Sequence, residues 1–571
     1  MHLDPSRRSP QRGHLHQVTP SLCIKPSPAE KLHGEVVTIF VDRLLKMLSA
    51  WRSTPSGSKA QGKIPLSSSL RVNLAALRAT FADAADCVVK EFYLGGRASR
   101  RIAIAYLDNM VDSAMIHDAL MQPLMIWARP AFTGDLSDAQ LLKEIKTALL
   151  PAQEIEDLAT IDEVIDNMIN GNVVLLVDGL RNAIDVESRG FQTRAIEEPT
   201  SEVTLRGTRE GMQETAAENL VLIRRRLRSS KLAVEQMVVG QKSKTDVRML
   251  YMKDIAPANV VDEIRQRIQS IDIDMVHGSR TLQELITDNP FSIFPTVKAT
   301  ERPDTAVACL AEGRVVILVD NDPFCLIMPM EFWAFFAAAE DYNFRFFIPS
   351  VLRILSIMAF LLAALLTPVY IALITFHQEL IPLTLLLNIA ATETGVPLPA
   401  AVNAFGVEIV LEVLREAGAR LPRAIGQAVS IVGAIVLGQA AVEAGFVSPG
   451  LVIVAATGAI FSFSVPQYEV TTAWRLMRFP LLILASTLGF YGVAWGMVLI
   501  VFHLASLKSF GVPYLALYSP GRVSELGDQL ITLPPSLQRR VRPVTTEDRV
   551  RQGPVPRQRG VDDVDSKNGG K

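Results

Sequence analysis

Residues 348–375 read IPSVLRILSIMAFLLAALLTPVYIALIT. The stretch contains a single charged residue, Arg353. A helix needs about 20 consecutive apolar residues to cross the hydrocarbon core of a bilayer, and this run exceeds that length. The sequence therefore predicts a protein that works at a membrane.

The composition of the 571-residue chain changes at the start of this run. Charged residues are frequent up to about Arg345, and apolar residues dominate from there to about Ser506. The hydrophobic part predicts crossings at about 350–375, 426–447 and 479–505, with a shorter one at 449–466. Residues 380–391 and 400–415 form either one bent crossing or a re-entrant piece followed by an interfacial helix. The sequence therefore leaves open whether the chain crosses the membrane four or five times, and on which side the C-terminal tail lies.

The soluble half contains an internal repeat. Residues 101–108 (RIAIAYLD) recur as 246–253 (DVRMLYMK), and residues 171–178 (GNVVLLVD) recur as 313–320 (GRVVILVD). The offsets of 145 and 142 residues are nearly equal. The Val-rich members are continuous apolar runs, which are typical of strands covered on both faces. The pattern predicts an α/β soluble region of two similar subdomains, followed by an α-helical multi-pass membrane domain.

These observations give five expected parts. They are a disordered leader (1–79), a first α/β subdomain (80–212), a linking helix with the second α/β subdomain (213–345), a transmembrane domain (346–510) and a polar C-terminal tail (511–571). Arg345 and Arg353 favour a soluble half on the cytoplasmic side. Four cysteines without pairing or metal spacing favour a reducing compartment.

The soluble half offers little evidence of catalysis. Residues 57–64 (GSKAQGKI) have the spacing of a phosphate-binding loop, but Ile64 stands where Ser or Thr should hold magnesium, and no strand precedes them. No Ser/His/Asp, Cys/His or paired-carboxylate arrangement stands out. We therefore expect no enzyme, no catalytic residue, no cofactor and no metal site. A net charge of −2 gives no argument for nucleic acid.

Small residues recur at every fourth position in the hydrophobic part, which lets another helix approach closely. The helix-packing candidates are Gly426, Ser430, Ala434 and Gly438. A second small-residue face consists of Ala485, Gly489, Gly492 and Gly496. Packing within one chain and assembly between subunits both explain such stripes.

Polar groups at membrane depth are costly and often mark a pathway. The pore or gating candidates are Glu393, Glu408, Glu412, Gln439 and Glu443. Glu408 and Glu412 share one helix face, so in a symmetric oligomer they would form carboxylate rings that attract cations. Alternatively, Glu412 pairs with Arg415 as an interfacial salt bridge.

A set of motifs resembles the GerA family of spore germination proteins, in family order over about residues 80–519. The motifs are Arg189–Gly190, 196–199 (IEEP), 206–211 (RGTREG), 222–226 (LIRRR), 244–246 (KTD), 272–274 (DID), 300–303 (TERP), 376–379 (FHQE) and 421–433 (LPRAIGQAVSIVG). Two segments depart from the family pattern, 391–395 (ATETG) and 403–406 (NAFG). If they line the pore, its conductance should differ from that of relatives.

The resemblance implies the A subunit of a nutrient germinant receptor in the spore inner membrane, a multi-pass protein with a cytoplasmic soluble region. It also implies homo-oligomers, as pentamers, that form a nutrient-gated cation channel in contact with membrane lipid. A permease-like B subunit would bind the nutrient, and a lipoprotein C subunit would complete the complex. Two alternatives are a stage V sporulation AF-type paralogue without its own nutrient sensor and a non-conducting membrane scaffold.

Overall fold

The computed structural model describes residues 64–94, 100–127, 138–148, 155–188, 206–345, 347–420 and 438–515, with residues 190, 198, 199, 202 and 204. The segment 57–63 and the packing candidates Gly426, Ser430 and Ala434 lie outside the described residues.

The first sheet has five antiparallel strands in the order β1-β2-β4-β5-β3. The strands are β1 (Cys87–Tyr93), β2 (Arg101–Leu107), β3 (Ile155–Leu158), β4 (Val173–Val177) and β5 (Ala183–Val186). Helices α2 (Leu70–Thr80) and α5 (Ile161–Ile169) cover one face. The other face packs against the helical segments Ser113–Met115 (α3), Ile116–Met121 (η2), Pro123–Trp127 (η3) and Asp138–Ala148 (α4).

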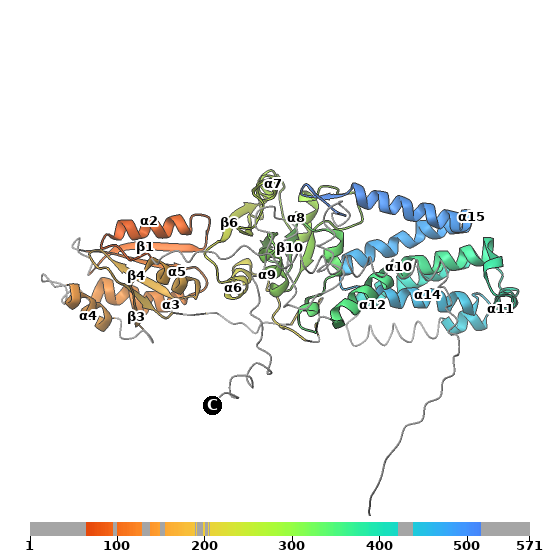
Figure 1. The fold of residues 1–571 in the computed structure, drawn as a ribbon, viewed down its shortest axis with the longest axis horizontal. Helices are drawn as coiled ribbons and strands as arrows, with labels where there is room; N and C mark the ends of the chain where they lie inside the picture. Colours follow the sequence, from red (N-terminus) through yellow and green to blue (C-terminus); the bar gives the residue numbers. More distant parts are fainter. Residues whose placement is uncertain are drawn as a thin grey trace, which may run out of the picture. The chain divides into compact units, whose positions relative to one another are not determined.

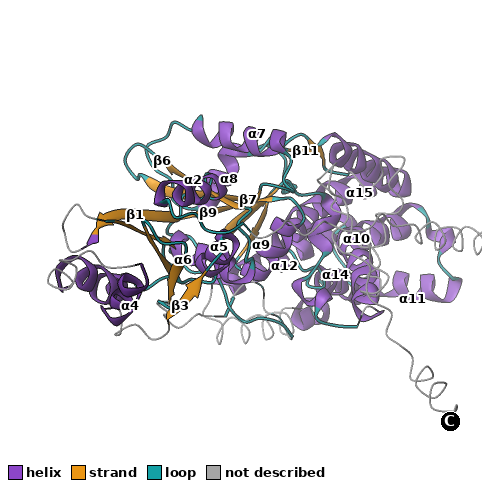
Figure 2. Ribbon diagram, turned by 60° about the vertical axis from the view of Figure 1, so that its left-hand side comes forward, coloured by secondary structure: helices purple, strands orange, loops and turns teal. Residues whose placement is uncertain are grey.

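The second sheet repeats this strand order as β6-β7-β9-β10-β8, again antiparallel throughout. Its strands are β6 (Leu232–Val239), β7 (Thr245–Met252), β8 (Lys298–Thr300), β9 (Val315–Val319) and β10 (Cys325–Met328). Helices α6 (Ala216–Arg226) and α9 (Pro303–Ala311) lie on one face. Helices α7 (Ala258–Gln269) and α8 (Ser279–Ile286) lie on the other; Figure 2 shows α6 and α7 on opposite sides.

The repeated sequence segments occupy equivalent strands. The first pair forms β2 and β7, and the second forms β4 and β9, at the same positions in the two sheets. Every residue of β4 and β9 is buried. Alternate side chains enter two different cores because successive residues of a strand point to opposite faces. Two α/β subdomains of like topology therefore follow from the repeat, as the sequence predicts.

A buried ion pair joins the two subdomains. The guanidinium of Arg224, on α6, donates to both carboxylate oxygens of Asp86 at 2.8 and 2.9 Å. Both side chains are almost completely buried. Beside them, the backbone N–H of Val234 donates to the carbonyl of Asp83 at 2.7 Å.

The described ends of the soluble part differ from the expected boundaries. Helix α2 begins at Leu70, within the expected leader, and packs against the first sheet. The short strands β11 (Lys508–Ser509) and β12 (Val512–Pro513) reach into the expected tail. Tyr514 after them is fully buried against the second subdomain, where its hydroxyl donates to the carbonyl of Pro295 at 2.7 Å.

The helical region spans residues 347–506. It contains η6 (Gln378–Leu380) and the helices α10 (Phe347–Phe376), α11 (Leu383–Glu393), α12 (Ala400–Arg420), α14 (Pro449–Ser462) and α15 (Tyr468–Ser506). Among the described residues, α10 and α15 are long and apolar enough to cross a membrane. Most of segment 380–391 lies in α11 and segment 400–415 lies in α12, on either side of Pro397 and Pro399. The predicted crossing at 426–447 lies mostly outside the described residues.

Helix α15 reverses direction instead of forming the single crossing predicted at 479–505. Gly489 has φ 61° and ψ −141°, which interrupts the helix. A Cβ atom on Gly492 would lie 2.1 Å from the carbonyl oxygen of Leu484, and one on Gly496 would lie 2.5 Å from Leu481 Cδ2. These contacts pair residues on opposite sides of Gly489. The result is a helical hairpin, visible in Figure 1 as two adjacent blue arms. The second small-residue face is thus a contact within one chain.

Substituting Gly492 tests this hairpin. Gly492→Ala should destabilise the protein by about 1–3 kcal/mol, because the new methyl group forces the two arms apart. The matched control is Gly406→Ala on α12, where an added Cβ has nothing within 4 Å. The measurement is the midpoint of thermal unfolding of the detergent-purified proteins. Equal midpoints for the two variants would contradict the close approach of the arms.

Candidate functional site at the junction of the second sheet and the helices

The second sheet shares a hydrophobic core with the helical region. The core passes from Val316 and Leu318 of β9 through the 3₁₀ helix η4 (Phe332–Phe336) to α10 and α15. Phe360 of α10 stacks on Trp474 of α15, with ring centroids 4.4 Å apart. Because packed cores transmit displacement rather than absorb it, movement of the second sheet should reach both helices.

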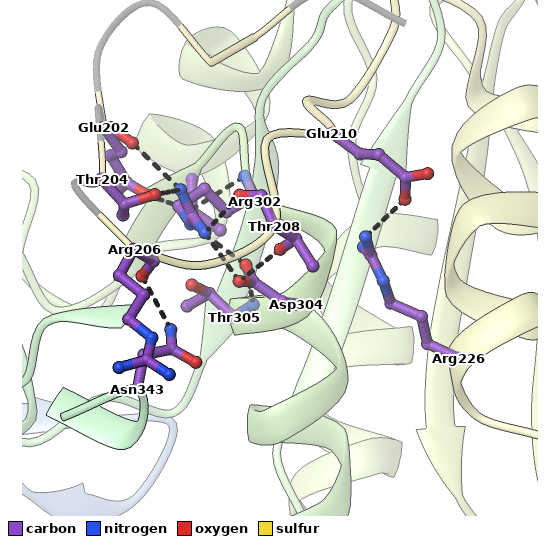
Figure 3. Close-up of polar contacts among 11 residues, drawn as sticks. Glu202, Thr204, Arg206, Thr208, Glu210, Arg226, Arg302, Asp304, Thr305 and Asn343 are labelled. Carbon is purple, nitrogen blue, oxygen red and sulfur yellow. Dashed lines mark hydrogen bonds and ion pairs between the residues drawn. The ribbon is translucent and has the colours of Figure 1, made fainter. Parts of the chain in front are cut away.

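A connecting segment lies across this junction, and Arg302 holds it. We call residues 202–210 the strap. The guanidinium of Arg302, 1% exposed, donates to the carbonyls of Glu202 and Thr208 at 3.2 and 3.0 Å and to Thr204 Oγ1 at 3.1 Å. It also binds both oxygens of Asp304 at 3.1 and 2.7 Å, as Figure 3 shows. Two motifs of the family resemblance, 206–211 and 300–303, thus meet at one buried cation.

Asp304 is the anionic partner of Arg302. Burial alone would raise the pKa of its carboxyl group. The hydrogen bonds and charge of Arg302, with hydrogen bonds from Thr208 and the backbone of Thr305, outweigh burial and hold the pKa below its ordinary value. The carboxyl group is therefore ionised at neutral pH, and its attachment to the strap is stable there.

The strap also contacts the chain that leads into α15 and α10. Glu202 accepts a hydrogen bond from Gln467, the residue before α15, at 3.1 Å. Its other carboxylate oxygen accepts one from Thr300 at 2.7 Å. The amide of Asn343, a few residues before α10, donates to the carbonyl of Arg206 at 3.0 Å. The strap therefore connects β8 and α9 of the second subdomain to the starts of two helices.

A cluster of five charged residues lies among the helices. Arg478 of α15 forms an ion pair with Glu408 of α12 and donates to the carbonyl of Ala363 on α10. Thr367, also on α10, donates to Glu408 at 2.6 Å. Both charged side chains are at most 5% exposed. Removal of either partner would leave a buried charge uncompensated.

The second part of this cluster centres on Glu412. Its carboxylate accepts from Arg475 of α15 at 3.0 Å and from Arg415 at 3.2 Å. Arg415 also donates to Ser462 at the end of α14 at 3.3 Å. The charge cluster, consisting of Glu408, Glu412, Arg415, Arg475 and Arg478, thus involves α12, α14 and α15, and through Glu408 also α10. With three cations and two carboxylates, it has a formal charge of +1.

The other sequence candidates lie apart from the charge cluster. Gln439 donates to Glu443 at 2.8 Å, and both are exposed. Glu393 is half-buried at the end of α11 and lines a small cavity of about 20 Å³ with Tyr370 and Asn403. A Cβ on Gly438 would lie 3.9 Å from Val452 on α14, an ordinary contact. A pore or gating role for the five polar candidates stays a prediction.

Sequence reasoning did not assign roles to Arg302, Arg475 and Arg478. The alternative pairing of Glu412 with Arg415 is present, but no motif described above pairs either glutamate with the two arginines of α15. Their spacing of three residues places them on one helix face, which is a signal available in the sequence. Nothing in the sequence around Arg302 indicates that it binds the strap.

Comparisons with known proteins identify the family. The model of the family described as Bacillus/Clostridium GerA spore germination protein matches residues 75–544. Spore germination protein KA of Bacillus subtilis (strain 168) is 38% identical over 489 residues, covering 86% of this chain and 89% of that protein. The uncharacterized membrane protein YfkQ of the same strain is 38% identical over 473 residues, covering 82% and 90%.

One solved structure is also similar. The crystal structure of the N-terminal domain of the A subunit of the Bacillus megaterium spore germinant receptor GerK3 is 30% identical, with a TM-score of 0.38, and covers 48% of this chain and 99% of that one. The family match over residues 75–544 includes both sheets, the strap and the helices that carry the charge cluster. On that match, this chain belongs to the GerA family of spore germination proteins.

Proposed function

We propose that this chain is the A subunit of a nutrient germinant receptor in the spore inner membrane, with a permease-like B subunit and a lipoprotein C subunit as partners. The proposal rests on the junction. There the second sheet and helices α10 and α15 share one hydrophobic core, and Arg302 holds the strap. Such a junction suits a subunit that passes a signal from a soluble part to membrane helices. The family membership supports the role in germination.

The proposed output is cation passage through a homo-oligomer of the helical region. In the present arrangement, Glu408 and Glu412 are compensated by three guanidinium groups, so their carboxylates would attract cations weakly. Opening would require Arg475 and Arg478 to move away with α15, which begins beside the strap at Gln467. We therefore assign the present arrangement to the closed state.

The proposal includes an even number of membrane crossings. The chain enters the helical region at α10, directly after Asp341 and Asn343 at the junction. It leaves after α15, where Ser509 donates to the carbonyl of Thr296 at 2.7 Å in the second subdomain. Entry and exit on the same side require an even count. Five crossings, one of the two counts that the sequence leaves open, would not meet this requirement, and the hairpin of α15 replaces the single crossing that both counts place at 479–505.

Labelling of introduced cysteines tests the crossing number. Asp108→Cys in the first subdomain and Lys508→Cys after α15 should both be protected from a membrane-impermeant maleimide added outside intact cells. Tyr491→Cys, 65% exposed at the turn of the hairpin, should be labelled from outside. The parent without these substitutions controls for the native cysteines. Labelling of Lys508→Cys without labelling of Asp108→Cys would mean an odd number of crossings.

Potassium release tests the function. In spores that lack all other germinant receptors, we expect nutrient-triggered potassium efflux only when this chain is expressed together with its B and C subunits. Efflux should fall to background when any of the three is omitted, with protein levels checked by immunoblot. Efflux that needs only this chain would contradict the receptor assignment and support the stage V sporulation AF-type alternative.

A further inference from the structure

An aromatic side chain stands exposed in the soluble part beside the end of α15. Phe291 is 99% exposed, and Ile293 next to it is 41% exposed. Both belong to the segment 289–293, which we call the 289 loop. A large apolar side chain that is fully exposed in water lacks the burial that normally favours its position. Something outside the described chain should therefore cover it.

The 289 loop is held in place from both sides. Ser292 Oγ and His503 Nε2 are 3.0 Å apart, which fixes the loop to the last turns of α15. The backbone N–H of Ser292 donates to the carbonyl of Asn289 at 3.1 Å, and that of Phe294 donates to Ser292 Oγ at 3.2 Å. Phe294 is buried, with its ring 6.5 Å from that of Trp474. Phe291 is therefore exposed on a turn that the hydrogen bonds of Ser292 and the packing of Phe294 hold in place.

The neighbouring surface of α15 is apolar and exposed. Phe502, adjacent in sequence to His503, is 70% exposed, and Leu499 one turn earlier is 60% exposed. Lys508, just beyond the helix end, is exposed as well. An apolar helix face that ends near a lysine is typical of a segment leaving the bilayer, because long cationic side chains reach the headgroups there. Phe is among the apolar residues that interfacial segments bury at the boundary between headgroups and acyl chains. Phe291 therefore lies close to the depth at which the lipid acyl chains of the bilayer end.

We propose that the 289 loop is an interfacial anchor, with Phe291 inserted at the boundary between lipid headgroups and acyl chains. The proposal rests on the membrane placement of α15 in the proposed function. The occupant is lipid because Ser292, next to Phe291, contacts His503, and the exposed side chains of Leu499 and Phe502 on the same part of α15 must be covered by a bilayer if α15 crosses it. Insertion would hold the second subdomain at a fixed distance from the membrane. The strap and α15 would then move relative to a subdomain whose position over the bilayer stays constant.

The test places a polarity-sensitive fluorophore at single cysteines in the full chain, reconstituted in vesicles of phosphatidylglycerol and phosphatidylethanolamine. Cys23, Cys87 and Cys309 are replaced by Ser, and buried Cys325 is kept. The probe positions are Phe291→Cys, Leu499→Cys as the lipid-facing reference and Val72→Cys as the aqueous reference, 56% exposed on α2. Quenching by aqueous iodide and by lipids that carry a nitroxide near the headgroup or deep in the acyl chain is then measured.

We expect the probe at 291 to be several-fold less accessible to iodide than the probe at 72, and quenched more by the shallow nitroxide than by the deep one. Iodide access equal to that at position 72, with position 499 quenched by lipid, would overturn the anchor and leave the membrane placement intact. Shielding at 291 from both iodide and nitroxides would mean that protein covers Phe291, which also overturns the proposal. Iodide access at position 499 would refute the membrane placement and the anchor together.

Discussion

Glu408→Gln should lower the stability of the protein by about 3–5 kcal/mol, because the substitution leaves the buried guanidinium of Arg478 without its counter-charge. Arg478 would retain its bond to the carbonyl of Ala363, but a carbonyl carries no net charge. The measurement is thermal unfolding of the purified protein. A drop in the amount of protein in spores should accompany it.

Two further variants separate a lost ion pair from a general defect. Glu412→Gln should have a smaller effect because the Glu412 side chain is 36% exposed, so solvent screens its ion pairs. The double variant Glu408→Leu with Arg478→Met should recover most of the loss, since it removes both buried charges and keeps apolar volume. Equal destabilisation by Glu408→Gln and Glu412→Gln would contradict the buried pair.

The same residues bear on cation release. The sequence-based prediction is that Glu408→Gln combined with Glu412→Gln reduces potassium efflux without abolishing assembly. The buried pair adds the requirement that efflux be compared at equal protein level, because instability alone would lower it. Efflux equal to wild type at equal protein level would remove both residues from the pore.

Arg302→Ala should detach the strap and reduce nutrient-triggered potassium efflux several-fold or more. The variant removes hydrogen bonds to Glu202, Thr204 and Thr208 and leaves Asp304 without its charged partner. Together these losses should cost about 2–5 kcal/mol. Arg302→Lys should not restore function, because one ammonium group cannot bind the strap and both oxygens of Asp304 in the same geometry. Limited proteolysis of the strap reports detachment directly.

The matched control for Arg302 lies on the strap itself. Arg209 is 72% exposed and pairs with Glu198, which is 58% exposed. Arg209→Ala should therefore change stability by less than about 1 kcal/mol and leave the strap as resistant to protease as in the parent. The role of Arg302 in holding the strap would be refuted if Arg209→Ala were as damaging as Arg302→Ala, or if Arg302→Lys behaved like the parent.

Much of the soluble architecture can be predicted from the residues alone. The Val-rich runs of β4 and β9 are unbroken, so each had to be covered on two faces, and their recurrence at a nearly constant offset required two like subdomains. The motifs 206–211 and 300–303 indicated the family, although their contact through Arg302 could not be read from residues almost a hundred positions apart.

The helical hairpin and the charge cluster could not be predicted, because both depend on how helices pack in three dimensions. Hydropathy averages the apolar content of 479–505 and carries no record of direction, so a span that reverses at Gly489 has the same average as one that crosses. Glu408 was predicted, together with Glu412, as a carboxylate of a cation pathway, and its pairing with Arg478 was not expected because the two residues lie 70 positions apart. Which charges meet depends on how α12 packs against α15, and helix periodicity specifies only the face on which each charge lies.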